Sequence, residues 1–253
     1  MFEVPDALPP ETYIVVRLDG RGFRRFTDEH SFTKPVDERG LLLMNAAAAA
    51  VMRDWGDVIF AYGHSDEFSF VFPPRAVVFG RRAAKLATGI ATLFAGEYVR
   101  LWGSIMGDAT PLRRAPAFDA RAVSYPRLRH VADYFRWRAA DAHVNALYNA
   151  AFWALVQHKN LPHGEAHAAL MGSSSEIKHE ILHGVGINYA KLSAISRRGT
   201  SLARGGLGGQ AEAPLLPDAE AAVLRLPRSM TLYYADLAGE PALLNDFFAP
   251  HEV

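Results

Sequence analysis

The sequence contains no cysteine among its 253 residues, which excludes disulfide bonds, thiolate metal sites and thiol nucleophiles. Any metal ion would therefore be held by oxygen atoms or by imidazole nitrogens. The chain also carries no formal net charge, because 27 lysines and arginines balance 27 aspartates and glutamates. This balance argues against a protein that coats nucleic acid in general, although it is compatible with a local basic surface.

No apolar run is long enough to span a membrane, and the first residues form neither a basic leader nor an apolar signal region. We therefore expect a cytoplasmic protein that has no membrane partner. Hydrophobic residues make up 50% of the chain and charged residues 21%, as in soluble globular proteins. The length allows one large domain or two small ones, each with its own core.

The hydrophobic pattern predicts an ordered series of strands and helices in the first half of the chain. In chain order these are a strand at Tyr13–Leu18, a helix capped by Asp37, a hairpin at Val58–Phe72, a helix at Arg75–Trp102 and a strand at Phe118–Pro126. Because the hairpin contributes two strands, the order is strand, helix, strand, strand, helix, strand. This order is typical of a ferredoxin-like βαββαβ core in an α+β protein.

The hairpin "FAYGHSDEFSFVF" is unusual because it carries two adjacent acids, Asp66 and Glu67, in an apolar run. Turn-forming residues at Gly63–Asp66 place these acids at the tip of the hairpin. In a ferredoxin-like core the first and third strands are adjacent and antiparallel, so Asp19, at the end of the first strand, lies near the tip. We therefore expect three carboxylates to meet at one edge of the sheet.

Three carboxylates at one edge repel one another unless a cation neutralises them. With only oxygen ligands at hand, magnesium is the natural cation, since it keeps several waters and binds phosphates. Two such ions close together stabilise in-line displacement at phosphorus. An acidic pair in a turn is more often simply solvated, so this expectation depends on the meeting with Asp19.

Several segments resemble, in register from about Tyr13 to Thr200, the histidine-tRNA guanylyltransferase family and its tRNA guanylyltransferase-like relatives. They include "VVRLDGRGF", "YGHSDEFSFVF", "FDARAVSYP" and "HVNALYN". The resemblance implies a palm-like catalytic core that adds guanylate or template-matched nucleotides to the 5′ end of tRNA, in the 3′-to-5′ direction. It also implies two Mg²⁺ ions, GTP and ATP as substrates, tRNA as partner, and a homotetramer.

The resemblance implies a catalytic and nucleotide-binding site in the first half of the chain. Asp19, Asp66 and Glu67 would be catalytic, and two metal ions would be held by Asp19, Asp66 and the backbone oxygen of Gly20. The implied nucleotide-binding residues are Asp19, Gly20, Arg21, Gly22, Phe23, Arg24, Lys34, Ser65, Asp66, Arg82 and Lys85. Backbone amides approach phosphate only where no side chain intervenes, so glycines suit this loop. Helical spacing would place Arg81, Arg82 and Lys85 on one face, although such a face is more often simply solvated.

A second implied group, in the later part of the chain, would contact the tRNA or a second nucleotide. Its members are Arg121, His143, Asn145, Asn149, Lys178, Glu180, Asn188, Arg197 and Arg198. The two asparagines fall on the polar side of a long helix, whose opposite side predicts a core stripe. That stripe comprises Val144, Leu147, Tyr148, Ala151, Phe152 and Leu155. A capped helix is predicted at "SSSEIKHEIL", and the fork of the arginine side chain suits phosphate oxygens.

Five positions depart from the family pattern. Pro73 and Pro74, directly after the hairpin, stand where basic residues are common. Arg24 stands where a histidine is common, His64 where a glutamine is common, and Ala146 where a second asparagine is common. None of these changes touches the carboxylates, so polymerase chemistry is expected to be retained. The departures leave two uses open: selective guanine addition in tRNA-His maturation, or 5′-end repair of truncated tRNAs by Watson–Crick pairing.

Two other functional classes are alternatives. A palm-type nucleotide cyclase or dinucleotide synthase could use the same paired acids on free nucleotides. A non-catalytic RNA-binding module could use the sheet, with Phe68, Phe70 and Phe72 as stacking platforms. We expect these phenylalanines to be core residues instead, because they alternate on one face of a strand.

The sequence also predicts a division into two domains. We expect a palm-like catalytic domain at 1–128 and a mainly helical C-terminal domain at 129–253. Gly, Ala and Pro accumulate at about 200–222, which predicts a flexible arm. Apolar residues after Leu226 are expected to dock on the body of the protein.

Overall fold

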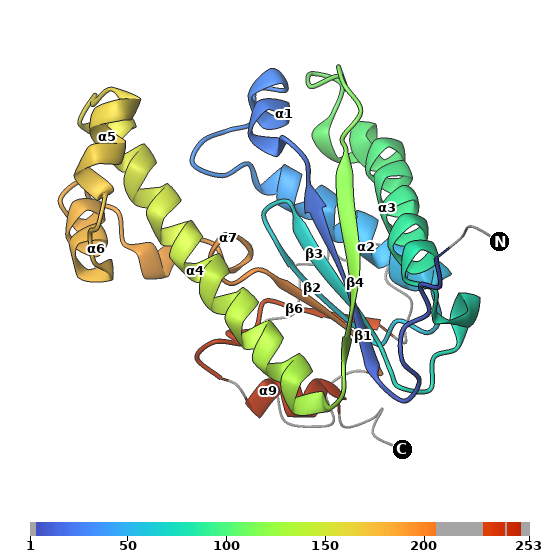
Figure 1. The fold of residues 1–253 in the computed structure, drawn as a ribbon. Helices are drawn as coiled ribbons and strands as arrows, with labels where there is room; N and C mark the ends of the chain where they lie inside the picture. The colour runs from blue at the N-terminus through green and yellow to red at the C-terminus, as the bar shows by residue number, and fades with distance from the viewer. Residues whose placement is uncertain (1–3, 206–229, 241, 249–253) are drawn as a thin grey trace.

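The computed structural model describes residues 4–205, 230–240 and 242–248 of the chain, and an antiparallel sheet forms its centre (Figure 1). The strands, in the order in which they lie side by side, are β4 (Phe118–Tyr125), β1 (Tyr13–Gly20), β3 (Glu67–Phe72), β2 (Phe60–His64), β5 (Thr200–Arg204) and β6 (Met230–Tyr233). The first and third strands are thus central, adjacent and antiparallel, as the ferredoxin-like order predicts. The α+β palm-like fold class is confirmed.

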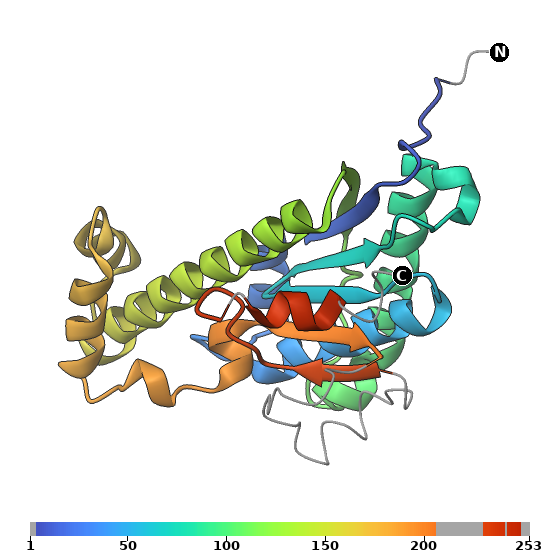
Figure 2. The same ribbon diagram turned by 90° about the horizontal axis from the view of Figure 1, so that it is seen from below.

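Helices cover both faces of this sheet. The α-helices of the described residues are α1 (Phe23–Glu29), α2 (Glu38–Asp54), α3 (Ala83–Met106), α4 (Leu128–His158), α5 (His163–Leu170), α6 (Ser175–His183), α7 (Ala194–Arg198) and α9 (Ala242–Phe248). The helices α2 and α3 lie on one face, while α4 and α9 lie on the other (Figures 1 and 2). No helix in the described part of the chain is long and apolar enough to cross a membrane.

Strand alternation divides the apolar residues of the sheet between two cores. The side chains of Phe68, Phe70 and Phe72 are buried against α2 and α3 in the larger core. Because these rings are buried, they cannot serve as base-stacking platforms, and the structure removes that alternative. The intervening residue Val71 and its neighbour Val15 on β1 pack in the second core, beneath α4 and α9.

The helix expected at Arg75–Trp102 begins later than predicted. Three successive residues, Phe79, Gly80 and Arg81, have positive φ angles of 50°, 60° and 59°. A left-handed backbone cannot continue a right-handed helix, so α3 starts only at Ala83. The buried Arg81 side chain donates to four backbone carbonyl groups. The predicted basic helix face that included this arginine is therefore wrong.

The C-terminal part adds strands as well as helices. The first five residues of the predicted flexible arm form β5, which pairs with β2 and is buried in the sheet. That portion of the prediction is wrong, and residues 206–222 lie outside the described residues. The expected docking of the tail is confirmed for α9, because Phe247 and Phe248 lie 5.0 and 5.2 Å from Phe60, measured between ring centroids.

The long helix α4 joins the sheet to a separate group of helices. Its first half packs on the sheet, and its second half extends away to meet α5 and α6 (Figure 2). We call the second half of α4, with α5 and α6, the C-terminal lobe. Leu147, Phe152 and Leu155 are buried in its core, as predicted. Val144 is 55% exposed, so its assignment to that core stripe is wrong.

Candidate active site

The residues at the end of β1 and at the tip of the β2–β3 hairpin lie side by side. Asp19 on β1 pairs with Glu67 at the start of β3, and the amide of Gly20 donates to the carbonyl oxygen of Asp66 at 3.0 Å. We call the group formed by Asp19, Gly20, Ser65, Asp66 and Glu67 the acidic edge. The predicted meeting of three acids at one edge of the sheet is therefore present in the backbone register.

Only a glycine fits between β1 and the hairpin tip. A Cβ atom at Gly20 would lie 2.8 Å from Oδ2 of Asp66 and 2.5 Å from the ring of Phe23. Contacts of this length are far inside van der Waals separation and would push the tip away. The glycine therefore allows the Asp66 carboxylate to lie directly against the backbone of residue 20.

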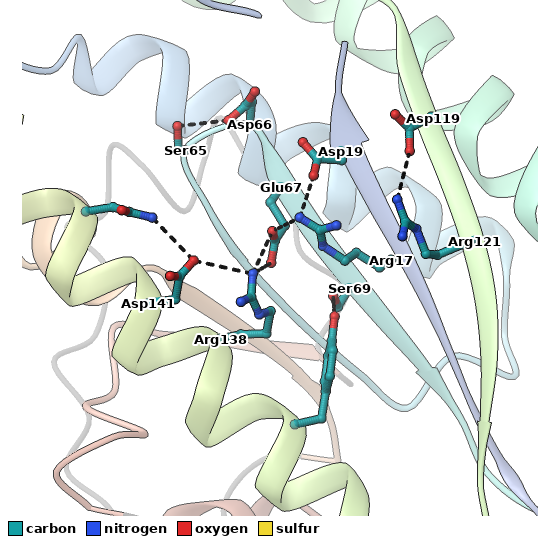
Figure 3. A network of polar contacts seen from close by, with 12 residues as sticks. Arg17, Asp19, Ser65, Asp66, Glu67, Ser69, Asp119, Arg121, Arg138 and Asp141 are labelled. Carbon is teal, nitrogen blue, oxygen red and sulfur yellow. Dashed lines mark hydrogen bonds and ion pairs between the residues drawn. The ribbon is translucent and has the colours of Figure 1, made fainter.

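The three carboxylates do not face a single point. Arg17 on β1 donates to both Asp19 and Glu67, and Arg138 on α4 donates to Glu67 at 3.1 and 3.2 Å (Figure 3). Asp66 lies apart from these arginines, and its Oδ1 accepts a hydrogen bond from Ser65 at 3.1 Å. The expectation that a metal must neutralise all three acids needs correction, because two guanidinium groups already neutralise Glu67.

The electrostatics of the acidic edge single out Asp66. Burial raises the pKa of the Asp66 carboxyl above its ordinary value, and the nearby charges of Asp19 and Glu67 raise it further. For Arg17, burial alone would lower the pKa, but the hydrogen bond to Glu67 outweighs it and the pKa is raised. The Asp66 carboxylate is thus the acid whose ionised form gains most from an additional cation.

A cavity of about 580 Å³ opens beside the acidic edge. The residues predicted for the site that line it are Asp19, Phe23, Arg24, Lys34, Ser65, Asp66, Glu67, Asn145 and Asn149. One wall is apolar, formed by Phe32, Leu41 and Met44. A cavity of this size, with acids at one end and an apolar wall, is large enough for a nucleotide.

The helix α4 also holds the loop that closes the far side of this cavity. Asn149 donates to the carbonyl oxygen of Pro35 at 2.8 Å, and Gln157 donates to that of Lys34 at 3.3 Å. The ammonium group of Lys34 binds Asp28 at 2.8 Å and lies 5.8 Å from the ring centroid of Trp153. Asn149, predicted to contact tRNA, therefore positions the loop in this structure.

Two of the loop amides predicted to contact phosphate are already occupied. The amide of Gly20 donates to Asp66, and that of Arg21 donates to the carbonyl oxygen of Ala117 at 2.8 Å. These two donors cannot also bind a phosphate without breaking the sheet edge. Gly22 has a φ of 64° and precedes the first turn of α1, which is the conformation that required a glycine in this loop.

Arg82 and Lys85, predicted to bind the nucleotide, lie at the other end of the sheet. Residue 82 pairs with Asp6 near the N-terminus, at 3.1 Å between Nε and Oδ1. Both basic residues belong to the beginning of α3, whose opposite end approaches the α1 side of the molecule (Figure 1). Neither lines the cavity beside the acidic edge, so the structure does not bring them to the predicted site.

Most of the second predicted group lies in or near the C-terminal lobe and does not line the cavity. The buried ammonium of Lys178 binds the carbonyl oxygens of residues 173 and 174, and the side chain of Asn188 caps a short turn by accepting from the amide of residue 190. His143 and Arg197 both lie beside the ring of Tyr189. Lys178 and Asn188, both predicted to contact RNA, therefore bond to backbone atoms of the protein itself.

The other members of this group are dispersed. Glu180 is exposed on α6. Arg198 ends α7, and its carbonyl oxygen accepts from the hydroxyl of Tyr62 at 2.8 Å. Arg121 lies on β4 in register with Arg17, two residues from the strand position of Asp19. Of the nine residues, only Asn145 and Asn149 line the cavity.

Sequence reasoning missed several residues that line the cavity. Among them are Arg17, Asp37, Tyr62, His64, Arg138, Asp141, Trp153 and Ser196. Burial lowers the pKa of the His64 imidazole, whose Nε2 donates to the carbonyl oxygen of Ser196 at 3.0 Å. A signal for Arg17 was available, because strand alternation puts it on the same face as Asp19.

The donor set at the acidic edge fits a magnesium ion only if few protein ligands are needed. In residues 4–205, 230–240 and 242–248, no three histidine, aspartate or glutamate side chains are grouped so as to hold a metal ion. The Asp66 carboxylate, the carbonyl oxygen of Gly20 and one oxygen of Asp19, whose Oδ2 accepts from Arg17, remain as oxygen ligands. Magnesium commonly uses one or two carboxylates and fills its other positions with water and phosphate oxygens, so these residues fit it.

The sequence is similar to known proteins. A family model described as "tRNAHis guanylyltransferase" matches residues 1–126, and one described as "Thg1 C terminal domain" matches residues 129–223. The chain is 48% identical over 204 residues to the "Probable tRNA(His) guanylyltransferase" of Drosophila melanogaster, covering 80% of this chain and 71% of that protein.

Solved structures show the same fold. The crystal structure of tRNA(His) guanylyltransferase from Saccharomyces cerevisiae is similar with a TM-score of 0.77 and 39% identity, covering 81% of this chain and 91% of that one. A bacterial tRNA(His) guanylyltransferase-like protein in complex with ATP is similar with a TM-score of 0.66 and 24% identity, covering 79% and 82%. The second likeness concerns the fold alone.

Proposed function

The chain belongs to the tRNAHis guanylyltransferase family and is a nucleotidyltransferase, and we propose that it adds nucleotides to the 5′ end of tRNA at the acidic edge. The observation that carries this site assignment is the register of β1 and β3. It sets Asp19 opposite Glu67, and a glycine that cannot be replaced sets Asp66 against residue 20. Carboxylates from two strands, next to a nucleotide-sized cavity, suit phosphoryl chemistry.

The residues of the acidic edge take different roles in this proposal. Asp19, Asp66 and the carbonyl oxygen of Gly20 would hold two Mg²⁺ ions. Such ions, when bound, lower the pKa of an attacking hydroxyl group and stabilise the charge of a leaving group. Glu67 keeps Arg17 and Arg138 in place, so its contribution to activity is positional.

The cavity orients the reacting groups. Arg24, Lys34 and the hydroxyl of Ser65 line it and carry the donors that suit a triphosphate. The apolar wall formed by Phe32, Leu41 and Met44 suits the flat face of a base and excludes water from it. Most of the rate acceleration then comes from positioning and from charge stabilisation, as in phosphoryl transfer generally.

The reaction has three displacements at phosphorus. The 5′-phosphate of the tRNA attacks the α-phosphorus of ATP, which releases pyrophosphate and leaves an adenylylated 5′ end. The 3′-hydroxyl of GTP then attacks the 5′-phosphorus of the tRNA, and AMP leaves. Water then attacks the α-phosphorus of the new 5′-triphosphate, pyrophosphate leaves, and a 5′-monophosphate remains.

Template-matched addition is the finer proposal. Three of the five positions that depart from the family pattern, Arg24, His64 and Ala146, line the cavity. Burial lowers the pKa of the His64 imidazole, and its Nε2 donates to the carbonyl oxygen of Ser196, so the side chain supports the hairpin. Because the acids are retained, the enzyme is expected to keep nucleotidyl transfer. Because residues of the cavity wall differ from the family pattern, we propose that base pairing with the tRNA selects the nucleotide.

The test is incubation with each of four labelled triphosphates, ATP and Mg²⁺, using full-length tRNA-His and tRNAs that lack their first nucleotide. We expect label at the 5′ end of the truncated tRNAs, with the added base complementary to the opposite strand. Addition of guanine alone, whatever base lies opposite, would support tRNA-His maturation instead. Cyclic or dinucleotide products without RNA would contradict the proposal, as would RNA binding without transfer.

Other parts of the proposal are independent of the acidic edge. We propose a division between a palm-like unit at 1–128 and a C-terminal unit at 129–253 that also completes the sheet through β5 and β6. The homotetramer implied by the resemblance and the cytoplasmic location stay predictions. So do tRNA contacts for His143, Glu180, Arg197 and Arg198, and nucleotide contacts for Arg82 and Lys85.

A further inference from the structure

A second groove, of about 340 Å³, lies on the other side of Arg17 and Arg138 from the catalytic cavity. It runs between α4 and the two strands β1 and β4. Its lining consists of Val15, Arg17, Arg121, Val123, Tyr125, Tyr134, Trp137 and Arg138. It shares only the two arginines with the cavity, so they form the wall between the two spaces.

The charges of the two spaces differ. Five carboxylates line the catalytic cavity, those of Asp19, Asp37, Asp66, Glu67 and Asp141. Three guanidinium groups and no carboxylate line the groove. The carboxylates that pair with the shared arginines therefore face the cavity side, and the groove presents cations together with aromatic rings. This combination suits an anionic partner that has flat rings.

The groove contains a buried cation with an unused donor. The side chain of Arg138 is only 7% exposed, and its Nε, like that of Arg17, has no hydrogen-bond partner in the described part of the chain. Both Nε atoms are sealed from solvent, so a ligand in the groove would contact the accessible parts of Arg17 and Arg121, whose side chains are 25% and 65% exposed. Phosphate oxygens are strong acceptors for guanidinium donors.

An exposed indole forms the outer side of the groove. The guanidinium of Arg138 stacks on the ring of Trp137, 3.6 Å from its centroid, yet Trp137 is still 60% exposed. One face of the indole is thus covered and fixed while the other stays open. Val123 on the opposite side is 41% exposed. A fixed, open aromatic face beside cations is the arrangement on which bases of single-stranded nucleic acid stack.

The groove also lies close to the proposed reaction site. Arg121 and Arg17 pair across β4 and β1, two residues from the pair formed by Asp119 and Asp19. Two residues of a strand span about 7 Å, which one or two nucleotides can bridge. Figure 3 shows Arg121 beside the strands and apart from the network around Glu67; its ion pair there is with Asp119, at 3.9 Å.

We propose that this groove binds the unpaired nucleotides at the 3′ end of the tRNA, with a base stacked on Trp137 and a phosphate at Arg121. This inference rests on the proposed function, because the 5′ end then occupies the acidic edge. The 3′ strand is paired to the 5′ strand in the acceptor stem and continues past it as single-stranded nucleotides. A second copy of the chain is a poorer occupant, since a stable protein interface buries about 800 Å² on each partner and only two large apolar side chains are exposed here.

The test compares two RNA hairpins that carry the same acceptor stem, one ending in four unpaired 3′ nucleotides and one blunt. Binding is measured by fluorescence anisotropy with the wild-type protein, with Trp137→Ala, and with Phe79→Ala as control. Phe79 is 54% exposed but lies at the far end of the sheet. We expect the overhang to strengthen wild-type and Phe79→Ala binding about tenfold and to give no gain with Trp137→Ala. Blunt-hairpin binding should be equal in all three, and Trp137→Phe should restore most of the gain.

A salt titration isolates the phosphate contact. A plot of the logarithm of the binding constant against the logarithm of the salt concentration has a slope that counts phosphate contacts. For the overhang hairpin, Arg121→Ala should make this slope shallower by about one, and for the blunt hairpin the slope should not change. An overhang gain that persists in Trp137→Ala would overturn the inference. A different oligomeric state of Trp137→Ala and wild type in analytical ultracentrifugation would also overturn it, because the groove would then bind a second copy of the chain. Failure of the proposed function is separate, because it appears as wild-type protein that adds no nucleotide to any tRNA.

Discussion

The acidic edge and the C-terminal lobe use their polar side chains in opposite ways. At the edge, Asp19 and Asp66 are brought together by strand register, and the partly buried Asp66 has Ser65 as its side-chain hydrogen-bond partner. In the lobe, Lys178 and Asn188 bond to backbone atoms of their own turns. The edge therefore keeps an acid poorly neutralised, while these lobe residues are satisfied within the protein.

This difference separates chemistry from support. A buried acid whose pKa is raised has unfavourable free energy in its ionised form, and a protein retains such a group where a ligand relieves it. A side chain that closes a helix end contributes to stability whether or not a ligand binds. Substitutions at the edge should thus change activity most, and those in the lobe should change stability.

The largest expected effect follows from Asp66→Asn. Loss of one metal-binding carboxylate removes several kcal/mol of transition-state stabilisation, so 5′ nucleotide addition should fall on the order of 1000-fold. The asparagine side chain is nearly isosteric, so the circular dichroism spectrum should match that of the wild type. Asp57→Asn, an exposed acid before β2, is the matched control and should keep its activity. Normal addition by Asp66→Asn would mean that the edge and the lobe do not differ in this way.

Arg138→Leu should give the largest loss of stability. Arg138 is nearly buried and pairs with Glu67, which is 19% exposed, so breaking the pair should lower the free energy of unfolding by about 2–3 kcal/mol. Urea denaturation measures this loss. Arg17 still neutralises Glu67 in Arg138→Leu, so adding Glu67→Gln should cost less there than it costs in the wild type, because the pair is already broken. Strictly additive losses would show that the two side chains are not coupled.

Lys178→Met tests the lobe directly. The buried ammonium bonds two carbonyl oxygens, so its removal should lower the free energy of unfolding by about 1–2 kcal/mol. The affinity for tRNA should stay within about twofold of the wild type, since a charge that faces the protein cannot attract a phosphate. Lys159→Met, an exposed lysine at the end of α4, is the stability control. Weaker tRNA binding with unchanged stability would restore Lys178 as an RNA contact.

The smallest effects concern two helix caps, Asp37 of α2 and Ser174 of α6. Burial raises the pKa of Asp37, but hydrogen bonds from Arg39 and Thr33 outweigh it, so the pKa lies below its ordinary value. A lowered pKa gives stability that is present above the unfolded-state pKa and is lost as pH falls through the folded one. Asp37→Asn should therefore cost about 1 kcal/mol at pH 7, and the cost should shrink below about pH 4. Ser174→Ala should cost about 1 kcal/mol at both pH values. A cost of Asp37→Asn that does not change with pH would contradict this.

The meeting of Asp19 with Asp66 and Glu67 could be predicted from sequence because it depends only on strand order. Once alternation identifies the strands and the order is ferredoxin-like, the neighbours of β1 are fixed. Capping of α2 by Asp37 was likewise local, and the side chain does accept from the amide of residue 39. Predictions that rest on register or on local hydrogen bonds were therefore the reliable ones.

Features that depend on docking or on unusual backbone could not be predicted. Arg138 reaches Glu67 only because α4 crosses the sheet at that point, and its own sequence pattern shows just a polar helix side. The late start of α3 depends on positive φ at Phe79 and Arg81, residue types that rarely adopt it. The strand β5 is buried on both faces, so it shows no alternation, and the glycine-rich segment after it suggested an arm.

The central proposal is that Asp19 and Asp66, but not Glu67, form a metal site. The most direct test is electron paramagnetic resonance of bound Mn²⁺, used in place of Mg²⁺, in the wild type and in Asp19→Asn, Asp66→Asn and Glu67→Gln. We predict that the first two substitutions each abolish high-affinity binding and that Glu67→Gln keeps it, because the arginines hold Glu67 away from the metal. Retained binding in Asp66→Asn, or loss in Glu67→Gln equal to that in Asp19→Asn, would contradict the claim.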